Sequence, residues 1–132
     1  MKFISFIHNK EAKFGIINDK TILDLTGKVL KANTLKDLIA KNGISEAKKY
    51  AAENHGNINL EEIEYLPLIP NPGKIICVGL NYSEHVKETN RTIEENPVIF
   101  HRFPESQTAH LQPIQRPIAS QSLDYEGEMA VI

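Results

Sequence analysis

A cluster of turn-forming residues near the middle of the sequence limits what the chain can fold into: Pro67, Pro70, Asn71, Pro72 and Gly73. Proline fixes its own φ angle, lacks an amide proton and disfavours helix in the preceding residue. Neither a helix nor a central strand is therefore expected to run through this stretch. The cluster predicts a small N-terminal module over residues 1–70 and the first part of a second domain over residues 71–132.

The N-terminal half has the pattern of a β/α module. Short runs rich in β-branched and aromatic residues predict three strands, at residues 2–7, 13–17 and 21–25. Residues 18–20 predict a hairpin turn, because Asn and Asp tolerate left-handed backbone conformations. Thr34 is a candidate N-cap for a helix over residues 35–41, and Ser45 is the expected start of a second helix. Residues 60–68 resemble a connecting strand. Nothing in this half predicts a chemical site.

The composition is that of an ordinary folded protein. Of the 132 residues 41% are hydrophobic and 24% are charged, and the formal net charge is −2. A slightly acidic chain offers no electrostatic case for binding nucleic acid or an anionic membrane. No apolar run approaches the roughly 20 residues needed to span a bilayer, and the first residues do not resemble a signal peptide. We expect a cytoplasmic protein whose one cysteine is unpaired.

The second half begins with a predicted strand over residues 74–79, whose continuous apolar content indicates a buried strand. Cys77 lies inside this run, so we expect it to be a core thiol. Residues 83–88 have helical character, with Ser83 as a candidate cap. Residues 97–103 predict a further strand, followed by a loop that is rich in Pro, Ser and Gln.

His85 and Glu88 form a candidate catalytic pair in the predicted helix. Residues three apart lie on the same helical face. A carboxylate beside an imidazole raises the pKa of the imidazole and orients its ring, which suits proton transfer near neutral pH. The alternative is an ordinary surface turn in which Glu88 pairs with Lys87 or Arg91 and His85 faces water.

Two acidic residues close to the end of the sequence form a candidate metal site. Residues 126–132 alternate in a way that is typical of a strand, which places Glu126 and Glu128 on one face, about 6.5–7 Å apart. Two carboxylates so placed can share a hard divalent cation. The alternative is a pair of ordinary surface glutamates, which the spacing alone favours.

Two further side chains are candidates for binding substrate. Arg102 could bind a carboxylate through its fork of donors, or form a surface ion pair. The Ser106 hydroxyl could donate to a substrate oxygen, although turn chemistry explains this serine equally well.

Three motifs in order, at residues 71–88, 97–102 and 123–131, resemble the fumarylacetoacetate hydrolase family. The resemblance implies a metal-dependent enzyme for 2-oxo acids with a rolled mixed β-sheet, usually assembled as a homodimer. The expected fold is therefore β-rich α+β, with a small β/α module followed by the beginning of a fumarylacetoacetate hydrolase-like mixed β-roll. Relatives cleave C–C bonds in acylpyruvates, or hydrate, decarboxylate or isomerise related compounds.

The same resemblance implies roles for individual residues. Glu126 and Glu128 match the first two carboxylate ligands of the family's Mg²⁺ or Mn²⁺. His85 and Glu88 match its His–Glu dyad, which lies on a lid in relatives, and Arg102 matches a basic residue that contacts substrate. Relatives supply a third metal ligand, an Asp, several strands further on, so we expect this chain to be the N-terminal portion of a bacterial-type member.

The function predicted from the sequence is that of a metal-dependent hydrolase or lyase that cleaves a C–C bond in a 2,4-dioxo acid of the acylpyruvate type. In that mechanism His85 activates water while the metal chelates the 2-oxo acid. The alternatives are a decarboxylase, hydratase or isomerase of the same family, all catabolic enzymes for a small 2-oxo acid, or a truncated fragment without catalytic activity.

Overall fold

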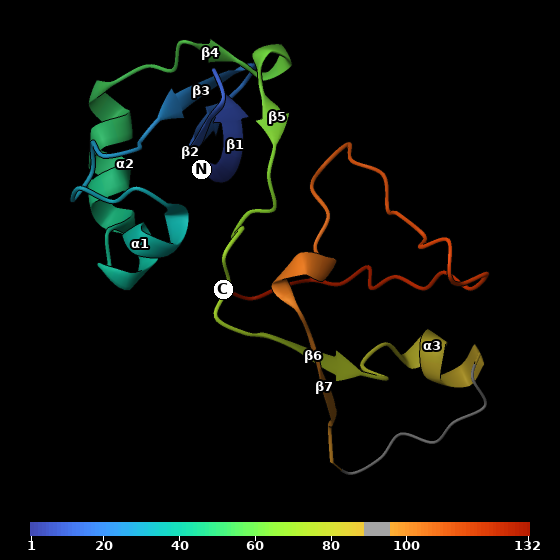
Figure 1. Ribbon diagram of the computed structural model, residues 1–132. Coiled ribbons are helices and arrows are strands. Elements are labelled where there is room, and N and C mark those ends of the chain that lie inside the picture. Colours follow the sequence, from blue (N-terminus) through green and yellow to red (C-terminus); the bar gives the residue numbers. More distant parts are fainter. Residues whose placement is uncertain (89–95) are drawn as a thin grey trace.

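The computed structural model describes residues 1–88 and 96–132, apart from the side chain of His85. Within these residues the fold is β-rich α+β and contains two antiparallel sheets. The first has five strands in the order β4-β3-β2-β1-β5, and the second has two, β6 and β7 (Figure 1). The boundary predicted at the proline cluster lies between the two sheets. The mixed β-roll remains a prediction.

The five-stranded sheet is built from hairpins near the N-terminus. Its strands are β1 (Lys2–His8), β2 (Glu11–Asn18), β3 (Thr21–Asp24), β4 (Ile58–Asn59) and β5 (Glu64–Tyr65). Asn9 and Lys10 join β1 to β2 with φ angles of 52° and 66°, as a tight two-residue hairpin requires. Asp19, with a φ of 52°, turns β2 into β3 and confirms the predicted hairpin. Of the connecting strand predicted over residues 60–68 only β5 forms, preceded by the short 3-10 helix η1 (Leu60–Glu62).

Two helices follow β3 in sequence: α1 (Leu35–Ala40) and α2 (Ile44–Glu53). Thr34 is the N-cap of α1, because its hydroxyl accepts the Asp37 amide proton at 3.1 Å, as predicted. The second helix begins at Ile44 after Gly43, so the expectation that Ser45 starts it is wrong. The Gly43 amide closes α1 on the Leu38 carbonyl at 2.8 Å, and a Cβ at Gly43 would lie 2.6 Å from a Leu38 methyl carbon. Gly43 holds the N-cap position, so Ser45 is already the second residue of the helix.

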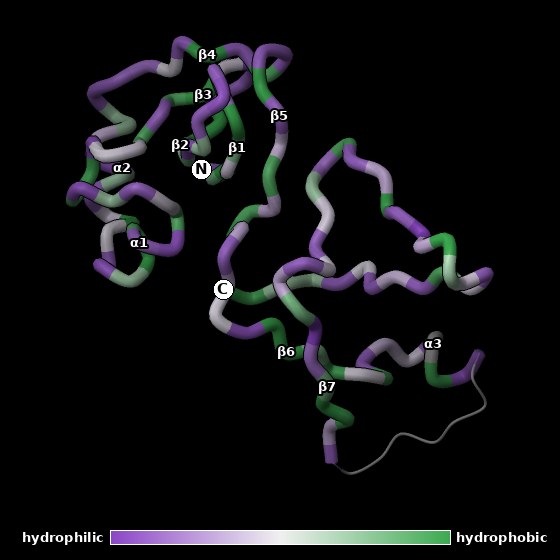
Figure 2. Tube along the Cα trace, viewed as in Figure 1, coloured by the Kyte–Doolittle hydropathy of each residue, from purple (hydrophilic) through white to green (hydrophobic). Residues whose placement is uncertain are grey.

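The core occupies both faces of the curled first sheet. The larger cluster joins β2 and β3 to the two helices: Phe14, Ile16, Leu23, Leu25, Val29, Ala32, Leu35, Leu38, Ala47 and Ile69. The smaller cluster lies on the other face: Ile4, Phe6, Ile22 and Ile58. Ile22 and Leu23 enter different clusters because successive strand residues point to opposite faces. Hydrophobic residues accordingly gather where β1, β2 and β3 meet (Figure 2).

The second sheet consists of β6 (Ile75–Gly79) and β7 (Val98–Arg102), paired from Ile75↔Arg102 to Gly79↔Val98. Both predicted strands are confirmed, but the expected burial of β6 is wrong. The side chains of Ile76 and Val78 are 63% and 39% exposed, and Cys77 is only partly buried rather than a core thiol. A sheet of two strands covers neither of its own faces, so continuous apolar content does not by itself bury a strand.

Two short helices flank the second sheet. Helix α3 (Ser83–Glu88) follows β6, and its Val86 side chain is buried. The 3-10 helix η2 (Pro104–Ser106) follows β7. Residues 107–132 then run without helix or strand, so the strand expected over residues 126–132 does not form. No neighbouring strand among the described residues pairs with this segment, and an unpaired strand is not stable.

Contacts across the proline cluster join the N-terminal module to the segment after β7. Gln107 donates from Nε2 to the Ile69 carbonyl at 3.3 Å, and Gln112 donates to the Tyr65 carbonyl at 3.1 Å. The His110 ring meets the Tyr65 ring edge to face, with centroids 4.9 Å apart. The described residues include no helix long and apolar enough to cross a membrane.

Candidate active site

Arg102, the last residue of β7, forms an ion pair with Glu126. Its Nη2 donates to Glu126 Oε1 at 2.7 Å, and the two side chains are 42% and 32% exposed. The guanidinium carbon also lies 5.3 Å from the centroid of the Phe100 ring, which is on the same face of β7 because the residues are two apart. The sequence left open whether Arg102 binds a substrate or forms an ion pair, and in this structure it binds another predicted site residue.

Glu128 lies in different surroundings from Glu126. It lines a hollow of about 740 Å³ between the N-terminal module and β6, together with Lys36, Ile76 and Met129. Glu126 is not part of the lining of this hollow. Residues 126–132 do not form a strand, so the alternation that was expected to place both carboxylates on one strand face is absent. Joint binding of a cation by the two glutamates remains a prediction.

The donor set suits a hard divalent cation in its chemistry. Glu126 and Glu128 supply carboxylate oxygens within three residues of chain, and both residues are exposed at the surface. Mg²⁺ is commonly held by one or two carboxylates, with water and substrate oxygens completing its shell. Within residues 1–88 and 96–132 no three His, Cys, Asp or Glu side chains gather as a metal-binding group. Binding of a cation by Glu126 and Glu128 remains a prediction.

The predicted His85–Glu88 pair lies on α3, so the helix on which the prediction depends is present. Glu88 is exposed to solvent and takes part in an interaction. The side chain of His85 lies outside what the structure describes, as does all of Arg91, the alternative partner of Glu88. The role of this pair in proton transfer therefore remains a prediction.

Ser106 uses its hydroxyl locally. Its Oγ donates to the Phe103 carbonyl at 2.8 Å, and its amide donates to the same oxygen at 3.0 Å. This is the turn interaction that the sequence offered as the alternative explanation. A contact between Ser106 and a substrate remains a prediction.

The Phe100 ring is a part of the site that sequence reasoning missed. It supports the Arg102 guanidinium, and the signal was present, because an aromatic residue two positions before an arginine in a strand must share its face. The Arg102–Glu126 contact carried no comparable signal. The residues are 24 apart, with η2 and a long irregular segment between them.

Among the described residues, the groups with a shifted pKa lie in the N-terminal module. Burial pushes the pKa of Asp24 upward, but the Thr26 backbone and side chain and the Lys13 ammonium outweigh it and hold this pKa below its ordinary value. Hydrogen bonding to Glu11 raises the pKa of Lys13 despite some desolvation, and Asp24 adds to the effect. These groups stabilise the sheet and are not among the predicted site residues.

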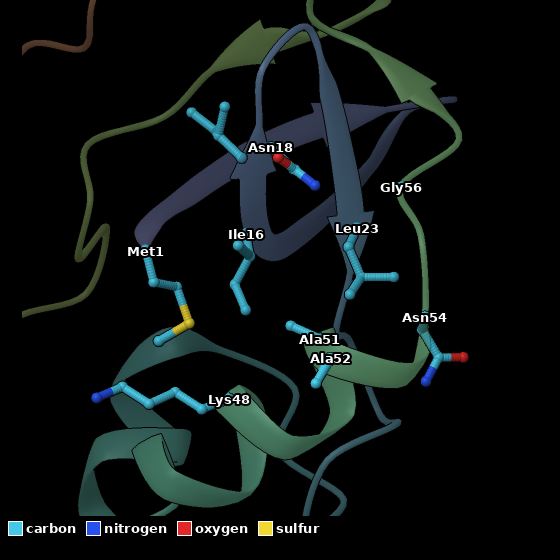
Figure 3. Close-up of a pocket in the computed structure, with 10 residues that line it drawn as sticks. Met1, Ile16, Asn18, Leu23, Lys48, Ala51, Ala52, Asn54 and Gly56 are labelled. Atoms are coloured by element: carbon cyan, nitrogen blue, oxygen red, sulfur yellow. The ribbon is translucent and has the colours of Figure 1, made fainter.

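A second hollow, of about 370 Å³, lies between the first sheet and α2 (Figure 3). Ile16 and Leu23 line it from the sheet, and Lys48, Ala51 and Ala52 line it from α2. None of the residues predicted to carry chemistry lines it. It is a feature of how α2 packs on the sheet.

Comparison with known proteins identifies the class of the second half. Residues 74–132 match the family model described as fumarylacetoacetate (FAA) hydrolase C-terminal. This range includes β6, α3, β7 and the acidic segment at residues 124–128, and thus every predicted site residue. The chain is a member of the fumarylacetoacetate hydrolase family, as its motifs predicted.

The similar proteins include named enzymes. Oxaloacetate tautomerase fahd2, mitochondrial, of Xenopus laevis is 34% identical over 94 residues, which are 71% of this chain and 30% of that protein. Oxaloacetate tautomerase Fahd2a, mitochondrial, of Rattus norvegicus is 35% identical over 92 residues, 70% of this chain and 29% of that protein. A fumarylacetoacetate hydrolase domain-containing protein 2 homolog of Dictyostelium discoideum is 28% identical over 140 residues, all of this chain and 46% of that protein. The chain thus spans between about a third and a half of these relatives.

Proposed function

We propose that the full-length protein is a metal-dependent enzyme that binds a small 2-oxo acid and moves a proton on it. The ion pair between Arg102 and Glu126 is the observation that carries this proposal. It brings a donor for carboxylate groups and a ligand for hard cations to within 2.7 Å of each other. A 2-oxo acid needs both groups, because it presents a carboxylate and a neighbouring ketone oxygen.

Each predicted residue has a role in this proposal. Glu126 and Glu128 would hold Mg²⁺ or Mn²⁺, and such an ion supplies a Lewis acid for the ketone and carboxylate oxygens. Arg102 would bind a carboxylate of the substrate through its fork of N–H donors. Ser106 would add a hydroxyl donor to a substrate oxygen.

Proton transfer belongs to the pair on α3. His85 would remove a proton from the substrate carbon next to the ketone, or from a water molecule that attacks a carbonyl carbon of the substrate. Glu88 would orient the imidazole and favour its protonated form. In both reactions the imidazole would accept a proton, so the same two residues could serve either enolisation or hydrolysis.

Keto–enol isomerisation is the reaction that the relatives favour, because several similar proteins are named as oxaloacetate tautomerases. It needs only removal of a proton from carbon and protonation of the ketone oxygen, or the reverse of these two steps. Hydrolysis of a C–C bond in an acylpyruvate is the second candidate, since the family model is named for a hydrolase. Hydrolysis would require a bound water as well.

The test compares both reactions in the full-length protein. Interconversion of keto and enol oxaloacetate and cleavage of an acylpyruvate are measured with added Mg²⁺, and the products are identified. We expect His85→Asn to slow the proposed reaction by about 10²- to 10⁴-fold, as general acid–base residues do. Glu128→Gln should abolish the activity that depends on added Mg²⁺.

Glu105→Gln is the matched control, because Glu105 is an exposed acid in η2 with no predicted role. It should retain the rate of the unmodified protein. Full Mg²⁺-dependent activity in Glu128→Gln would contradict the proposed metal site, and full activity in His85→Asn would contradict the proposed proton transfer.

A further inference from the structure

The Arg102–Glu126 ion pair joins two residues that the proposed function assigns to different partners. Glu126 is a proposed ligand of the cation, and Arg102 is the proposed site for a substrate carboxylate. In this structure the two side chains bind each other, with 2.7 Å between Arg102 Nη2 and Glu126 Oε1. A guanidinium this close to a carboxylate oxygen repels a divalent cation that approaches the same oxygen.

We infer that Arg102 and Glu126 exchange partners when a divalent cation binds. Binding of the cation to Glu126 releases the guanidinium, which then becomes available to a substrate carboxylate. Arg102 thereby couples the filling of the metal site to the formation of the anion site. This inference rests on the proposed function and adds an order of events that the proposed function does not contain.

The existing pair is weak enough to be exchanged. The two side chains are 42% and 32% exposed, so water and salt screen their attraction. A divalent cation carries twice the charge of the guanidinium and approaches a carboxylate oxygen to about 2.0–2.6 Å. The competition at Glu126 therefore favours the cation once it is present at sufficient concentration.

Phe100 keeps the released guanidinium in place. Its ring lies 5.3 Å from the guanidinium carbon, and both side chains rise from the same face of β7. The contact with Phe100 does not involve Glu126, so it can persist after the exchange. The N–H donors freed from Glu126 then lack a carboxylate partner, which is the state that attracts an anion.

Thermodynamic linkage makes the exchange reciprocal. If a cation increases the affinity of Arg102 for an anion, an anion on Arg102 must increase the affinity of Glu126 for the cation by the same factor. Direct chelation of the cation by the anion would also couple the two affinities. The decisive measurement must therefore observe the Arg102 side chain with the cation alone.

Nuclear magnetic resonance of the guanidinium nitrogens makes this observation. Residues 1–132 include three arginines, Arg91, Arg102 and Arg116, and Arg102→Lys identifies the signal of interest. Mg²⁺ is added to the full-length protein without substrate, and calorimetry in parallel records whether it binds. We expect Mg²⁺ to shift the Arg102 signals and to speed rotation of its guanidinium.

Arg116 is the internal control, because its Nη1 donates to Gln121 Oε1 at 3.3 Å and to the Ser120 carbonyl rather than to a carboxylate. Its signals should not respond to Mg²⁺. In Glu126→Gln the Arg102 signals should already have their released positions, and Mg²⁺ should not move them further. Glu126 is exposed, so this variant should fold normally.

The outcomes separate this inference from the proposed function. Mg²⁺ that binds while the Arg102 signals stay fixed would overturn the exchange and leave the proposed metal site intact. Arg102 signals that are the same in Glu126→Gln and in the unmodified protein would also overturn it, because the ion pair would not exist in solution. Absence of any Mg²⁺ binding would overturn the exchange and the proposed metal site together.

Discussion

The two halves of the chain differ in role: the first contains most of the buried core, and the second contains the residues predicted to carry chemistry. The N-terminal module has a five-stranded sheet with a buried cluster on each face, and its fully buried side chains include Phe6, Phe14 and Leu38. Residues 74–132 have a sheet of two strands and an acidic segment that is exposed throughout. Every residue predicted to act on a substrate or a cation lies in this open half. Substitutions in the first half should therefore mainly affect folding, and substitutions in the second half should mainly affect binding.

The largest expected effect comes from removing a buried ring. Phe14 is 1% exposed in the larger core cluster, so Phe14→Ala should cost about 3–5 kcal/mol of unfolding free energy through lost burial and the cavity left behind. Phe103, 68% exposed after β7, is the matched aromatic residue. Phe103→Ala should change stability by less than about 0.5 kcal/mol. Urea unfolding followed by circular dichroism measures both, and equal losses would contradict the division between the halves.

Glycines inside strands offer a second comparison, with a smaller effect. A Cβ at Gly15 of β2 would lie 2.3 Å from the Leu23 carbonyl oxygen, which the sheet holds in place. Gly15→Ala should therefore cost about 1–3 kcal/mol through overpacking. A Cβ at Gly79 of β6 would meet a Val98 methyl carbon at 3.3 Å, and that side chain can move. Thermal unfolding should show a clear loss for the first variant and little change for the second; the reverse order would be inconsistent with a rigid first sheet.

Local signals explain what the sequence could predict of this fold. Thr34 was recognisable as a cap because its partner, Asp37, is three residues away, and the turn at Asp19 depends only on which residues tolerate a positive φ. Burial of β6 and pairing of residues 126–132 depend instead on elements distant in sequence. Ile76 remains 63% exposed, and among the described residues no third strand extends the sheet. The patterns therefore predicted the residue types correctly but not their environment.

The candidate site follows the same rule. The types of residue that bind cations and anions could be identified from motifs, and the family that they indicated is confirmed. The contact between Arg102 and Glu126 could not be predicted, since it depends on how an irregular loop of the chain returns to the end of β7. Sequence therefore predicts which chemical groups are present, whereas their pairing requires the structure.

The dependence of stability on pH provides a test with a still smaller expected effect, at Asp24 of the N-terminal module. The pKa of Asp24 lies below its ordinary value of 3.8 in the folded protein, although burial opposes this, because Thr26 and Lys13 favour the carboxylate. Asp24 therefore contributes stability above pH 3.8, and this contribution is lost as the pH falls through the lower folded pKa. Asp24→Asn should be less stable near neutral pH and should lose less stability than the unmodified protein on acidification. Unfolding free energies measured at a series of pH values test this, and parallel pH profiles for the two proteins would contradict it.

The smallest expected effect is one that only a binding measurement detects. Phe100 supports the Arg102 guanidinium at 5.3 Å, and a cation–π contact at a partly exposed site contributes about 0.5–1 kcal/mol. Phe100→Leu should therefore weaken oxalate binding in the presence of Mg²⁺ by about 2- to 5-fold, while Mg²⁺ binding alone stays unchanged. Calorimetry measures both affinities in one protein.

The ring that follows Arg102 provides the control for this measurement. Phe103 contacts the His101 ring, with centroids 5.5 Å apart, whereas it is the Phe100 ring that lies against the guanidinium. Phe103→Leu should leave both affinities unchanged. If the two leucine variants weaken oxalate binding equally, the Phe100 ring does not position the guanidinium. If Phe100→Leu instead unfolds the protein, packing in the second half contributes to stability. That outcome would contradict the division of the chain into a half that stabilises the fold and a half that binds ligands.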